Sequence, residues 1–492
     1  MEKYVAVFDV GTTTVKGVLI NKNAEFFETH SIPIETMVDA DGKIEQNPLD
    51  WWHALKAITA TWWRKQAVLP EQIEMITFSG QMEDVIPVLE SKNPHPAILY
   101  SDTRAGVEAD QIRELARGLE EKTGNTISAT TPLAKLLWMK IYETNLFAKM
   151  KKVLFSSKDF LIHKLADAYV TDPTTASTTG MMNHVSRQWE KDLIENVGFD
   201  REKLPELKSS EGIAGYVTPE AEKEIGFKSN TPVLCGSGDG GATAVGAGAV
   251  CPGDAYGYVG TTGWLAVIGQ EIRREEKLSD LFHLAHLPQE RMVRIIPLLN
   301  AGNVYSWAVQ TFAAGDYTEF EKLIRQSEAG SNGVLFLPYL NGERNPVNDA
   351  DAKGAFWGLT QKTETGDLAR AVTEGIAFSL KQLSEYLGLT REKEFKLIGG
   401  VTKSSVFVQI LADCLNQAIS IPRDSEFMPS IGAASSAFIR LGWARNYQDF
   451  TDRFINQADS VVYQPIDENV NSYKKSYKQF IKLYPSMNHI YK

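Results

Sequence analysis

The sequence predicts an α/β protein built from two related domains that face each other. Its 492 residues are too many for one ordinary hydrophobic core, which favours two large domains. Apolar, β-rich segments alternate with segments of helical periodicity along the chain. One local arrangement occurs twice: a strand, a Gly/Thr turn and a second strand, at residues 4–20 and again at 255–269, about 250 residues later. This repeat predicts that the two domains share a similar fold.

Both predicted hairpins carry a turn that is suited to binding phosphate. The first joins the apolar runs Tyr4–Val10 and Val15–Ile20 through a Gly-Thr-Thr-Thr turn, and the second joins residues 255–259 and 264–269 through a Gly-Thr-Thr-Gly turn. Glycine lets the backbone approach a ligand closely, and successive N–H groups in a tight turn form a concavity that binds anions. A single copy would read as an ordinary hairpin, whereas the repeated pair favours two phosphate-binding turns.

The remaining elements follow from periodicity and from helix-start signals. The segment Asn47–Asp50 precedes a helical pattern at Trp51–Trp63. Further helices are predicted at residues 106–121, 132–149, 157–165, 242–250 and 404–416, and strands at 75–78, 231–235 and 395–398. No long linker rich in proline or serine interrupts the chain. We therefore expect a short boundary between an N-terminal domain at residues 1–245 and a C-terminal domain at 246–492.

Charge and composition argue against several classes of protein. Lys and Arg number 51 and Asp and Glu number 62, a net charge of −11 spread along the chain, so the basic stripe of a nucleic-acid-binding protein is missing. No apolar run approaches the ~20 residues of a membrane span. The three cysteines are widely separated and form no Cys-X-X-Cys pair, which favours a reduced, cytoplasmic setting. Phosphate binding by such an acidic protein requires a metal ion, a placed Lys or Arg, or oriented backbone amides.

Two aspartates and a lysine lie near the predicted phosphate-binding elements. Asp9 comes just before the first turn, and an aspartate beside phosphates commonly holds Mg²⁺. Lys16 follows this turn and would add a positive charge. Asp239 lies in the Gly-rich segment after the strand at 231–235, where it could accept a proton from a substrate hydroxyl. We expect the Asp239 carboxylate to be ionised at neutral pH.

The Gly-rich segment around Asp239 also allows a second interpretation. Gly236, Gly238 and Gly241 fit the pattern G-x-G-x-x-G between a strand and a helix, which is typical of dinucleotide-binding folds and would indicate an NAD-dependent oxidoreductase. The mid-chain position and the aspartate inside the loop argue against this interpretation. No G-x-x-x-x-G-K-[ST] segment occurs, which argues against a P-loop kinase.

Polar and glycine residues elsewhere add to a candidate cleft. Charged side chains at residues 83–84 and 102–104 follow strand-like runs, where they suit a polyhydroxylated ligand. Gly399-Gly400, between a strand and a helix, would let a flat ligand such as adenine lie on the backbone.

Taken in order, these segments resemble the FGGY carbohydrate kinases over nearly the whole chain. The most specific matches are Phe336–Pro346 (FLPYLNGERNP) and Ala352–Thr360 (AKGAFWGLT), which are similar to the family runs FLPYLxGER-x-P and ARGAFxGLT. Further matches are Thr131–Trp138, Lys158-Asp159, Asp172–Ser177 and Glu374–Phe378. The resemblance implies two actin-like (ribonuclease H-like) domains with a nucleotide and sugar cleft between them.

The resemblance also implies roles for individual residues. Asp239 matches the catalytic aspartate, and together with Asp9 it is expected to hold Mg²⁺. The residues expected to bind ATP are Gly11, Thr12, Thr13 and Lys16 in the first phosphate motif, Gly260, Thr261 and Thr262 in the second, Gly302 at the nucleotide wall, and Gly399, Gly400 and Ser404 in the adenosine motif. The residues that lie where sugar-binding residues are expected are Gln81, Met82, Glu83, Asp102 and Arg104.

Departures from the family pattern leave the acceptor open. Glu83 and Gly240 replace a histidine and an asparagine of xylulokinase-like members; Glu83 resembles glycerol kinase, the Asp239-Gly240 pair resembles gluconate kinases, and residues 45–48 resemble xylulokinases. The expected activity is ATP-dependent phosphorylation of a terminal hydroxyl, with D-xylulose as the leading acceptor and gluconate or a short polyol or ketose as alternatives. A non-catalytic sugar sensor would have lost Asp9, Asp239 or a Gly/Thr turn, and all are present. A homodimer is usual for the family.

Overall fold

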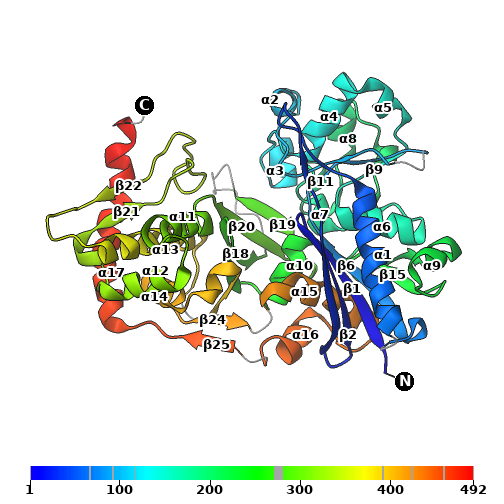
Figure 1. The fold of residues 1–492 in the computed structure, drawn as a ribbon. Coiled ribbons are helices and arrows are strands. Elements are labelled where there is room, and N and C mark those ends of the chain that lie inside the picture. Colours follow the sequence, from blue (N-terminus) through cyan, green and yellow to red (C-terminus); the bar gives the residue numbers. More distant parts are fainter. Residues whose placement is uncertain are drawn as a thin grey trace.

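The structure is a computed structural model that describes residues 2–65, 68–90, 94–116, 118–270, 281–390, 393–422, 425–457 and 460–490. Two α/β halves, each built around a mixed seven-stranded sheet, lie beside each other (Figure 1). The first half of the sequence forms one side of the molecule, most of the second half forms the other, and the two chain ends lie far apart. This architecture confirms the predicted two-domain α/β fold.

The first sheet contains the first Gly/Thr hairpin at its centre. Its strands, in spatial order, are β14 (Ile213–Tyr216), β15 (Pro232–Leu234), β6 (Ile73–Gly80), β1 (Tyr4–Val10), β2 (Thr14–Asn21) and β3 (Phe26–Pro33), with β16 (Ser237–Gly238) on the end of β6. Strands β1, β2 and β3 run antiparallel to one another, and β6 and β15 continue the sheet in parallel from β1.

The second sheet repeats the same five-strand core. Its strands, in spatial order, are β19 (Phe282–Ala285), β20 (Met292–Leu298), β18 (Gly263–Gly269), β17 (Ala255–Val259), β23 (Phe395–Ile398), β24 (Ile419–Pro422) and β25 (Ser460–Tyr463). Strands β20, β18 and β17 are antiparallel, and β23 and β24 run parallel to β17. Each core therefore has the order 3-2-1-4-5, and the predicted hairpin supplies strands 1 and 2 in both.

Shorter strands form small two- and three-stranded sheets outside the two large sheets. They are β4 (Met37–Val38), β5 (Ile44–Gln46) and β8 (Ala97–Ile98); β7 (Ile86–Val88) and β9 (Lys152–Leu154); β10 (Val170–Thr171) and β13 (Glu206–Leu207); β11 (Met182–Asn183) and β12 (Gln188–Trp189); and β21 (Leu335–Leu337) and β22 (Ala355–Trp357).

Helices cover both faces of the first sheet. Helices α1 (Pro48–Lys65), α6 (Ser157–Ala166) and α9 (Pro219–Ile225) cover one face, while α10 (Asp239–Gly246), α15 (Met428–Arg440) and α16 (Tyr447–Phe454) pack on the other. Outer helices of this half are α2 (Gly106–Leu115), α3 (Leu119–Thr123), α4 (Pro132–Tyr142), α5 (Thr144–Lys149), α7 (Pro173–Ala176) and α8 (Lys191–Asn196). Helix α1 buries Trp51, Leu55, Ile58 and Trp62, the apolar stripe that predicted it.

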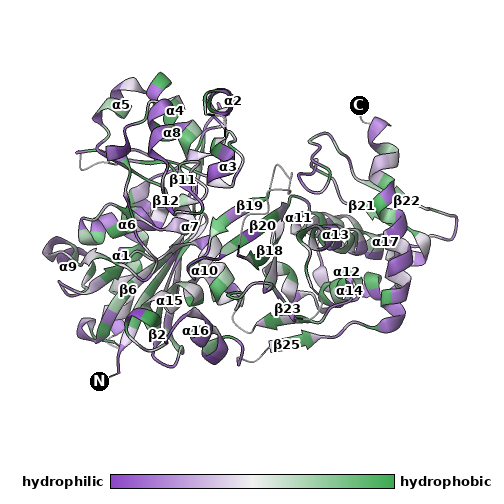
Figure 2. Cartoon of the chain, turned by 180° about the vertical axis from the view of Figure 1, so that it is seen from behind, coloured by the Kyte–Doolittle hydropathy of each residue, from purple (hydrophilic) through white to green (hydrophobic). Residues whose placement is uncertain are grey.

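The second sheet is covered by a separate helical layer. It consists of α11 (Gly302–Ala313), α12 (Tyr317–Gln326), α13 (Thr365–Leu387), α14 (Ser405–Leu415) and α17 (Asp467–Met487). Figure 2 shows that hydrophilic residues dominate α9 at the edge of the molecule, whereas α10 between the halves is mostly hydrophobic. None of the described helices is long and apolar enough to cross a membrane.

Three predicted helices differ from the structure. The pattern at 106–121 is divided between α2 and α3, with Gly118 in the left-handed region (φ 87°) before α3. The pattern at 132–149 is divided at Glu143, whose φ of −120° and ψ of 47° are not helical. The helix expected at 242–250 begins at Asp239 instead. Periodicity identified the apolar face of each helix but not where the helix breaks or begins, because these points depend on the backbone conformation of single residues.

Helices α10 and α15 pack between the two sheets at very short range. A side chain on Gly432 of α15 would overlap the Ala242 carbonyl oxygen of α10, and one on Gly246 would overlap the Met428 carbonyl. Glycine therefore lets the two backbones touch. Because α15 comes from the second half of the sequence and packs on the first sheet, the domain division at residue 245 stays a prediction.

Replacing Gly432 with valine is expected to destabilise the protein by at least about 1–3 kcal/mol, the usual cost of overpacking, because the side chain meets backbone that cannot move alone. The midpoint of thermal or urea unfolding measures this loss. Gly106→Ala is the control, because its new Cβ lies 3.9 Å from the nearest atom outside its neighbours, an ordinary contact. Equal midpoints for both variants would contradict the close packing of α10 and α15.

Candidate active site

The first Gly/Thr turn lies at the end of β1, directly after Asp9. Asp9 is opposite Lys16 on β2 and Ser79 on β6 in the register of the sheet. The turn is fixed by backbone bonds, including Gly11 N–H to Thr14 O at 3.0 Å. Gln46 Nε2 donates to Thr12 O at 2.7 Å, and Ile34 N–H donates to Thr13 O at 2.8 Å. Neighbouring strands thus hold the turn in one conformation without using its threonine hydroxyls.

Lys16 is engaged with the second half of the sequence. Its Nζ donates to Glu426 O at 2.8 Å and lies 5.5 Å from the Phe427 ring centre. Burial raises the pKa of Asp9, and the charge of Lys16 opposes this rise. The structure therefore places Lys16 where it acts on Asp9 and on the contact with residues 426–427.

Asp239 and Asp9 lie within electrostatic range of each other. The short strand β16 pairs with the end of β6, so α10 starts with Asp239 next to the strand end that follows β1. Desolvation raises the pKa of Asp239 to about 7, and the charges of Asp9 and Asp172 add to this rise. Burial and the neighbouring carboxylates therefore oppose ionisation of Asp239 in the metal-free protein, an effect that the sequence did not indicate.

The pair of carboxylates fits a magnesium ion. Their mutual repulsion raises the pKa of Asp239, and a bound cation would remove that repulsion. Within the described ranges no group of three or more His, Cys, Asp or Glu side chains is placed to hold a metal. Mg²⁺ commonly takes only one or two carboxylates and completes its shell with water and substrate phosphates, which these two residues allow.

Neighbouring side chains leave little space for a side chain at the glycines around Asp239. A side chain at Gly238 would collide with the side chain of Met82, and one at Gly240 would lie 2.7 Å from Leu284 Cδ1 of the second sheet. A side chain at Gly240 would require the end of the Leu284 side chain to move, so the packing of the two halves favours glycine at this position.

Asp172 is a buried carboxylate near Asp239 to which the sequence assigned no role. Its Oδ1 accepts hydrogen bonds from Gly238 N–H at 3.1 Å and Thr175 Oγ1 at 2.6 Å, and its Oδ2 accepts from Thr174 N–H at 2.9 Å. Lys158 Nζ lies 3.0 Å from the same carboxylate. Because Gly238 immediately precedes Asp239, Asp172 positions the start of α10. The Asp-Pro pair at the start of α7 is a helix N-cap signal that could have identified this carboxylate.

Lys158 makes this network a buried ion cluster. Its Nζ also lies 2.6 Å from Asp159 Oδ1, and the side chains of Lys158, Asp159 and Asp172 have no solvent exposure. The two neighbouring carboxylates hold the Lys158 ammonium in its charged form and raise its pKa. With all three side chains charged the cluster has a net charge of −1, and hydrogen bonds from Gly238 N–H and the Thr175 hydroxyl to Asp172 help to stabilise it inside the protein.

Glu83 faces the space between the halves. Desolvation raises the pKa of Glu83 to about 7, the charges of Lys135 and Arg344 oppose this rise, and Asp239 adds to it. Glu83 therefore lies within electrostatic range of the catalytic candidate and of an arginine from the second half. Its φ of 63° is the left-handed region, which is uncommon for a non-glycine residue and indicates a constrained position.

The other predicted sugar-binding residues differ in which of their polar atoms lack a hydrogen-bond partner among the described residues. Gln81 is tied to the first turn, since its N–H donates to Val10 O, and its Oε1 has no hydrogen-bond partner in the described part of the chain. Asp102 is fully engaged: its carboxylate accepts from Ile44 N–H at 2.6 Å and from the Arg104 guanidinium at 2.7 Å. Arg104, in contrast to Asp102, has a buried Nη1 without a partner among the described residues. This Nη1 is the hydrogen-bond donor that the Asp102–Arg104 pair can still offer to a ligand.

The second Gly/Thr turn is bound to the start of α11. Gly260 N–H donates to Thr262 O at 2.9 Å, and Asn303 N–H donates to Thr261 O at 2.8 Å. A side chain at Gly302 would overlap the Gly260 carbonyl oxygen, so glycine is required where the helix meets the turn. The N-terminus of α11 thus lies beside the turn. Its Asn303, Val304 and Tyr305 N–H groups are already engaged, so the helix favours an anion there through its dipole.

The predicted adenosine loop joins β23 to α14. Gly399 has a φ of 101° and packs against the Val259 backbone, whereas the position a side chain would take at Gly400 is open. That open surface is compatible with a flat ligand. Ser404 is buried and caps α14, where its Oγ accepts from Phe407 N–H at 3.3 Å and pairs with Tyr305 OH at 3.1 Å. Its hydroxyl therefore has a structural role in linking α11 and α14.

Comparison with known proteins supports this arrangement. The family model for the N-terminal domain of the FGGY family of carbohydrate kinases matches residues 4–246, and the model for the C-terminal domain matches residues 224–441. The chain is similar to a xylulose kinase of Staphylococcus xylosus (29% identity, 98% of this chain and 99% of the relative). It is also similar to a gluconokinase of Bacillus subtilis (28% identity, 98% and 96%).

A solved structure agrees over nearly the whole fold. The ligand-bound xylulose kinase of Lactobacillus acidophilus superimposes with a TM-score of 0.90 at 27% identity and covers 99% of each chain. The dinucleotide-binding interpretation of Gly236–Gly241 is wrong, because this segment adds β16 to the first sheet and then starts α10 at the face between the halves. With both family models matched and both repeated hairpins in place, the chain belongs to the FGGY family of carbohydrate kinases.

Proposed function

We propose that the chain transfers the γ-phosphoryl group of ATP to a terminal hydroxyl of a small neutral sugar, with D-xylulose as the leading acceptor. The observation that carries this proposal is the proximity of Asp9 and Asp239, which the repeated Gly/Thr fold places at neighbouring strand ends. Phosphoryl transfer depends mainly on positioning and on charge neutralisation, and this site supplies carboxylates, backbone N–H groups and a helix N-terminus. Relatives named xylulose kinase and gluconokinase support the class of acceptor.

In this mechanism Asp239 acts as the general base. It accepts the proton of the substrate hydroxyl as that oxygen attacks the γ-phosphorus, and the bond from phosphorus to the bridging oxygen of ADP breaks. The two Gly/Thr turns bind the phosphates through backbone N–H groups, and the N-terminal dipole of α11 favours their negative charge. Asp9 and Asp239 would hold Mg²⁺, which neutralises phosphate charge when bound. Closure of the halves would exclude water from the phosphoryl group.

The charges around Glu83 favour a neutral acceptor over an acid. Desolvation raises the pKa values of Glu83 and Asp239 to about 7, and like charge adds to this rise, from Asp239 on Glu83 and from Asp9 and Asp172 on Asp239. An acceptor carboxylate beside them would add a third negative charge. A ketose or polyol instead offers hydroxyls that can donate to Glu83. Gluconate is the second candidate, on the specific observation that Arg104 has an unpaired, buried Nη1.

An ADP-release assay over about thirty sugars, polyols and aldonates tests the proposal. We expect D-xylulose to give the highest kcat/KM and aldonates to give much lower values. ADP release that no acceptor stimulates would contradict the kinase proposal, and a preference for gluconate would favour the second candidate.

Substituting Glu83 by glutamine is expected to lower kcat/KM for the neutral acceptor by about 10- to 100-fold. The reason is the loss of a hydrogen bond to a charged group, worth roughly 1.5–3 kcal/mol. Turnover of gluconate should stay level or rise, since one negative charge is removed. The selectivity ratio measures this effect, and Glu220→Gln on the exposed surface of α9 is the matched control. A loss of the same size for both acceptors would contradict a selective role for Glu83.

A further inference from the structure

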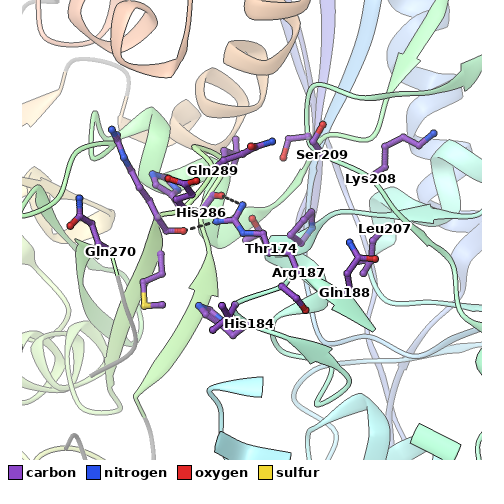
Figure 3. A pocket seen from close by; sticks show the side chains of 18 of the residues that line it. Thr174, His184, Arg187, Gln188, Leu207, Lys208, Ser209, Gln270, His286 and Gln289 are labelled. Atoms are coloured by element: carbon purple, nitrogen blue, oxygen red, sulfur yellow. Dashed lines mark hydrogen bonds between the residues drawn. The ribbon is translucent and has the colours of Figure 1, made fainter. Parts of the chain in front are cut away.

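A large cavity lies between the halves and is separate from the candidate active site. Its volume is about 690 Å³, and its walls come from the β11–β12 turn, from residues 207–210 and from the β19–β20 turn, so both halves contribute (Figure 3). None of the residues assigned above to ATP, Mg²⁺ or the acceptor lines it. The volume is in the range of ordinary small-molecule sites.

The two turns that face each other across this cavity each contain a strained, charged residue. Arg187 in the β11–β12 turn has a φ of 52°, and Glu290 in the β19–β20 turn has a φ of 60°. The left-handed region is uncommon for such residues and usually persists where the surroundings enforce it. Figure 3 shows Arg187 reaching across the boundary, where Nη1 donates to His286 O at 3.1 Å and Nη2 donates to Arg291 O at 2.8 Å. Arg187 therefore ties the two halves together.

The cavity walls combine cations with hydrogen-bond acceptors. Arg187, Lys208 and Arg291 supply three positive charges, and the acids that line the same cavity are Glu121 and Glu290. The lining residues are positive by one charge. Lys208 also lies 3.4 Å from the exposed Glu206 outside the lining, a solvent-screened pair that an anionic group in the cavity could replace.

Two histidines add neutral acceptors to this wall. His184 and His286 are buried, and burial lowers the pKa of each to about 3, so both rings are neutral at physiological pH. The Nδ1 atom of each ring has no hydrogen-bond partner in the described residues. His286 Nε2 lies 3.0 Å from Ala249 O and donates to it in the neutral ring, which leaves Nδ1 as an acceptor. Hydroxyl groups are the donors that such atoms would bind.

The cavity wall contacts the helix that begins with Asp239. Thr174 and Leu287 both line it, and both pack against Gly241 in the first turn of α10. Thr174 Oγ1 also donates to Ala285 O at 2.7 Å, a bond between the halves, and Thr174 N–H is held by Asp172. A ligand that fixes this wall would therefore fix the segments that position Asp239.

We propose that this cavity is a second small-molecule site, which binds a sugar phosphate and couples its binding to the relative position of the two halves. The phosphate would lie among Arg187, Lys208 and Arg291, and the sugar hydroxyls would face His184 and His286. The proposal does not depend on which acceptor the active site uses, because its contacts lie outside that site.

Calorimetric titration with ribose 5-phosphate tests this site in the intact protein without requiring activity. We expect binding that weakens at least tenfold in Lys208→Ala and stays unchanged in Glu83→Gln, which alters only the candidate active site. Lys223→Ala, an exposed lysine on α9, is the matched charge control and should bind as the unmodified protein does. No binding, or binding lost in Glu83→Gln and kept in Lys208→Ala, would overturn the proposal.

Inorganic phosphate is the second probe. We expect phosphate to bind at least tenfold more weakly than ribose 5-phosphate, because phosphate makes no contact with the histidines. Equal affinity would overturn the assignment to a sugar phosphate.

A third measurement uses initial rates of acceptor-dependent ADP release. Ribose 5-phosphate should change KM or kcat of the unmodified enzyme and leave Lys208→Ala unaffected, whereas an equal response of both would place the effect in the active site.

Discussion

Asp239→Asn is expected to lower kcat for phosphoryl transfer about 1,000-fold, within the 10²–10⁴ range that a positioned general base supplies. Asparagine has nearly the same shape but cannot accept the hydroxyl proton. Nucleotide binding should persist, because the Gly/Thr turns and the start of α11 are unchanged. Folding stability should be equal or higher, because the substitution removes a carboxylate whose ionisation is opposed by desolvation and by Asp9.

The pH dependence of the unmodified enzyme provides the accompanying measurement. A pKa raised to about 7 means that Asp239 is protonated, and unable to accept a proton, at lower pH. The value of kcat/KM should therefore fall as the pH decreases, with a limb at or below pH 7 because bound Mg²⁺ would remove the repulsion from Asp9, and this limb should be absent in the residual activity of Asp239→Asn. Asp467→Asn, at the start of α17, is the control substitution. Near-normal turnover by Asp239→Asn would contradict the assignment of the base.

The sequence predicted the framework of the fold because that information is local. The apolar runs around the Gly/Thr turn at residues 11–14 identify a hairpin without knowledge of any partner strand. Its second copy at 260–263 then implied a second sheet, and the structure shows the same 3-2-1-4-5 order in both. Asp9 was recognisable for the same reason, since it adjoins a turn that the sequence itself defines.

Features of the site that depend on distant residues could not be predicted. The raised pKa of Asp239 results from desolvation and from Asp9, which is 230 positions away in the chain. Asp102 was assigned to the acceptor, but its oxygens are engaged by Ile44 and Arg104. Gly240 was interpreted through substrate preference, and the structure instead shows Leu284 against it. Each case concerns what a side chain contacts after folding, which spacing along the chain does not encode.

The largest expected loss of stability belongs to Asp172→Ala. Removing a buried acceptor typically costs about 1–3 kcal/mol for each donor that is left without a partner, because that donor stays desolvated. Here the N–H groups of Gly238 and Thr174 and the Thr175 hydroxyl would lose their acceptor, while Lys158 would keep its ion pair with Asp159. Because Gly238 precedes Asp239, kcat should also fall about tenfold or more while KM for ATP changes little. Unfolding midpoints and initial rates measure the two effects.

The variant Asp316→Ala is the control that distinguishes the loss of the buried cluster from the loss of an ordinary helix cap. Asp316 also caps a helix, and its Oδ1 accepts from Thr318 N–H at 2.8 Å and Glu319 N–H at 3.1 Å, but this carboxylate is exposed. Its replacement should cost only about 1 kcal/mol, the usual value of an N-cap, and leave kcat unchanged. Asp172→Asn keeps the size of the side chain and one acceptor oxygen, so it should recover part of the lost kcat. If Asp172→Ala and Asp316→Ala lose equal stability and equal activity, the buried charge of Asp172 does not position Asp239.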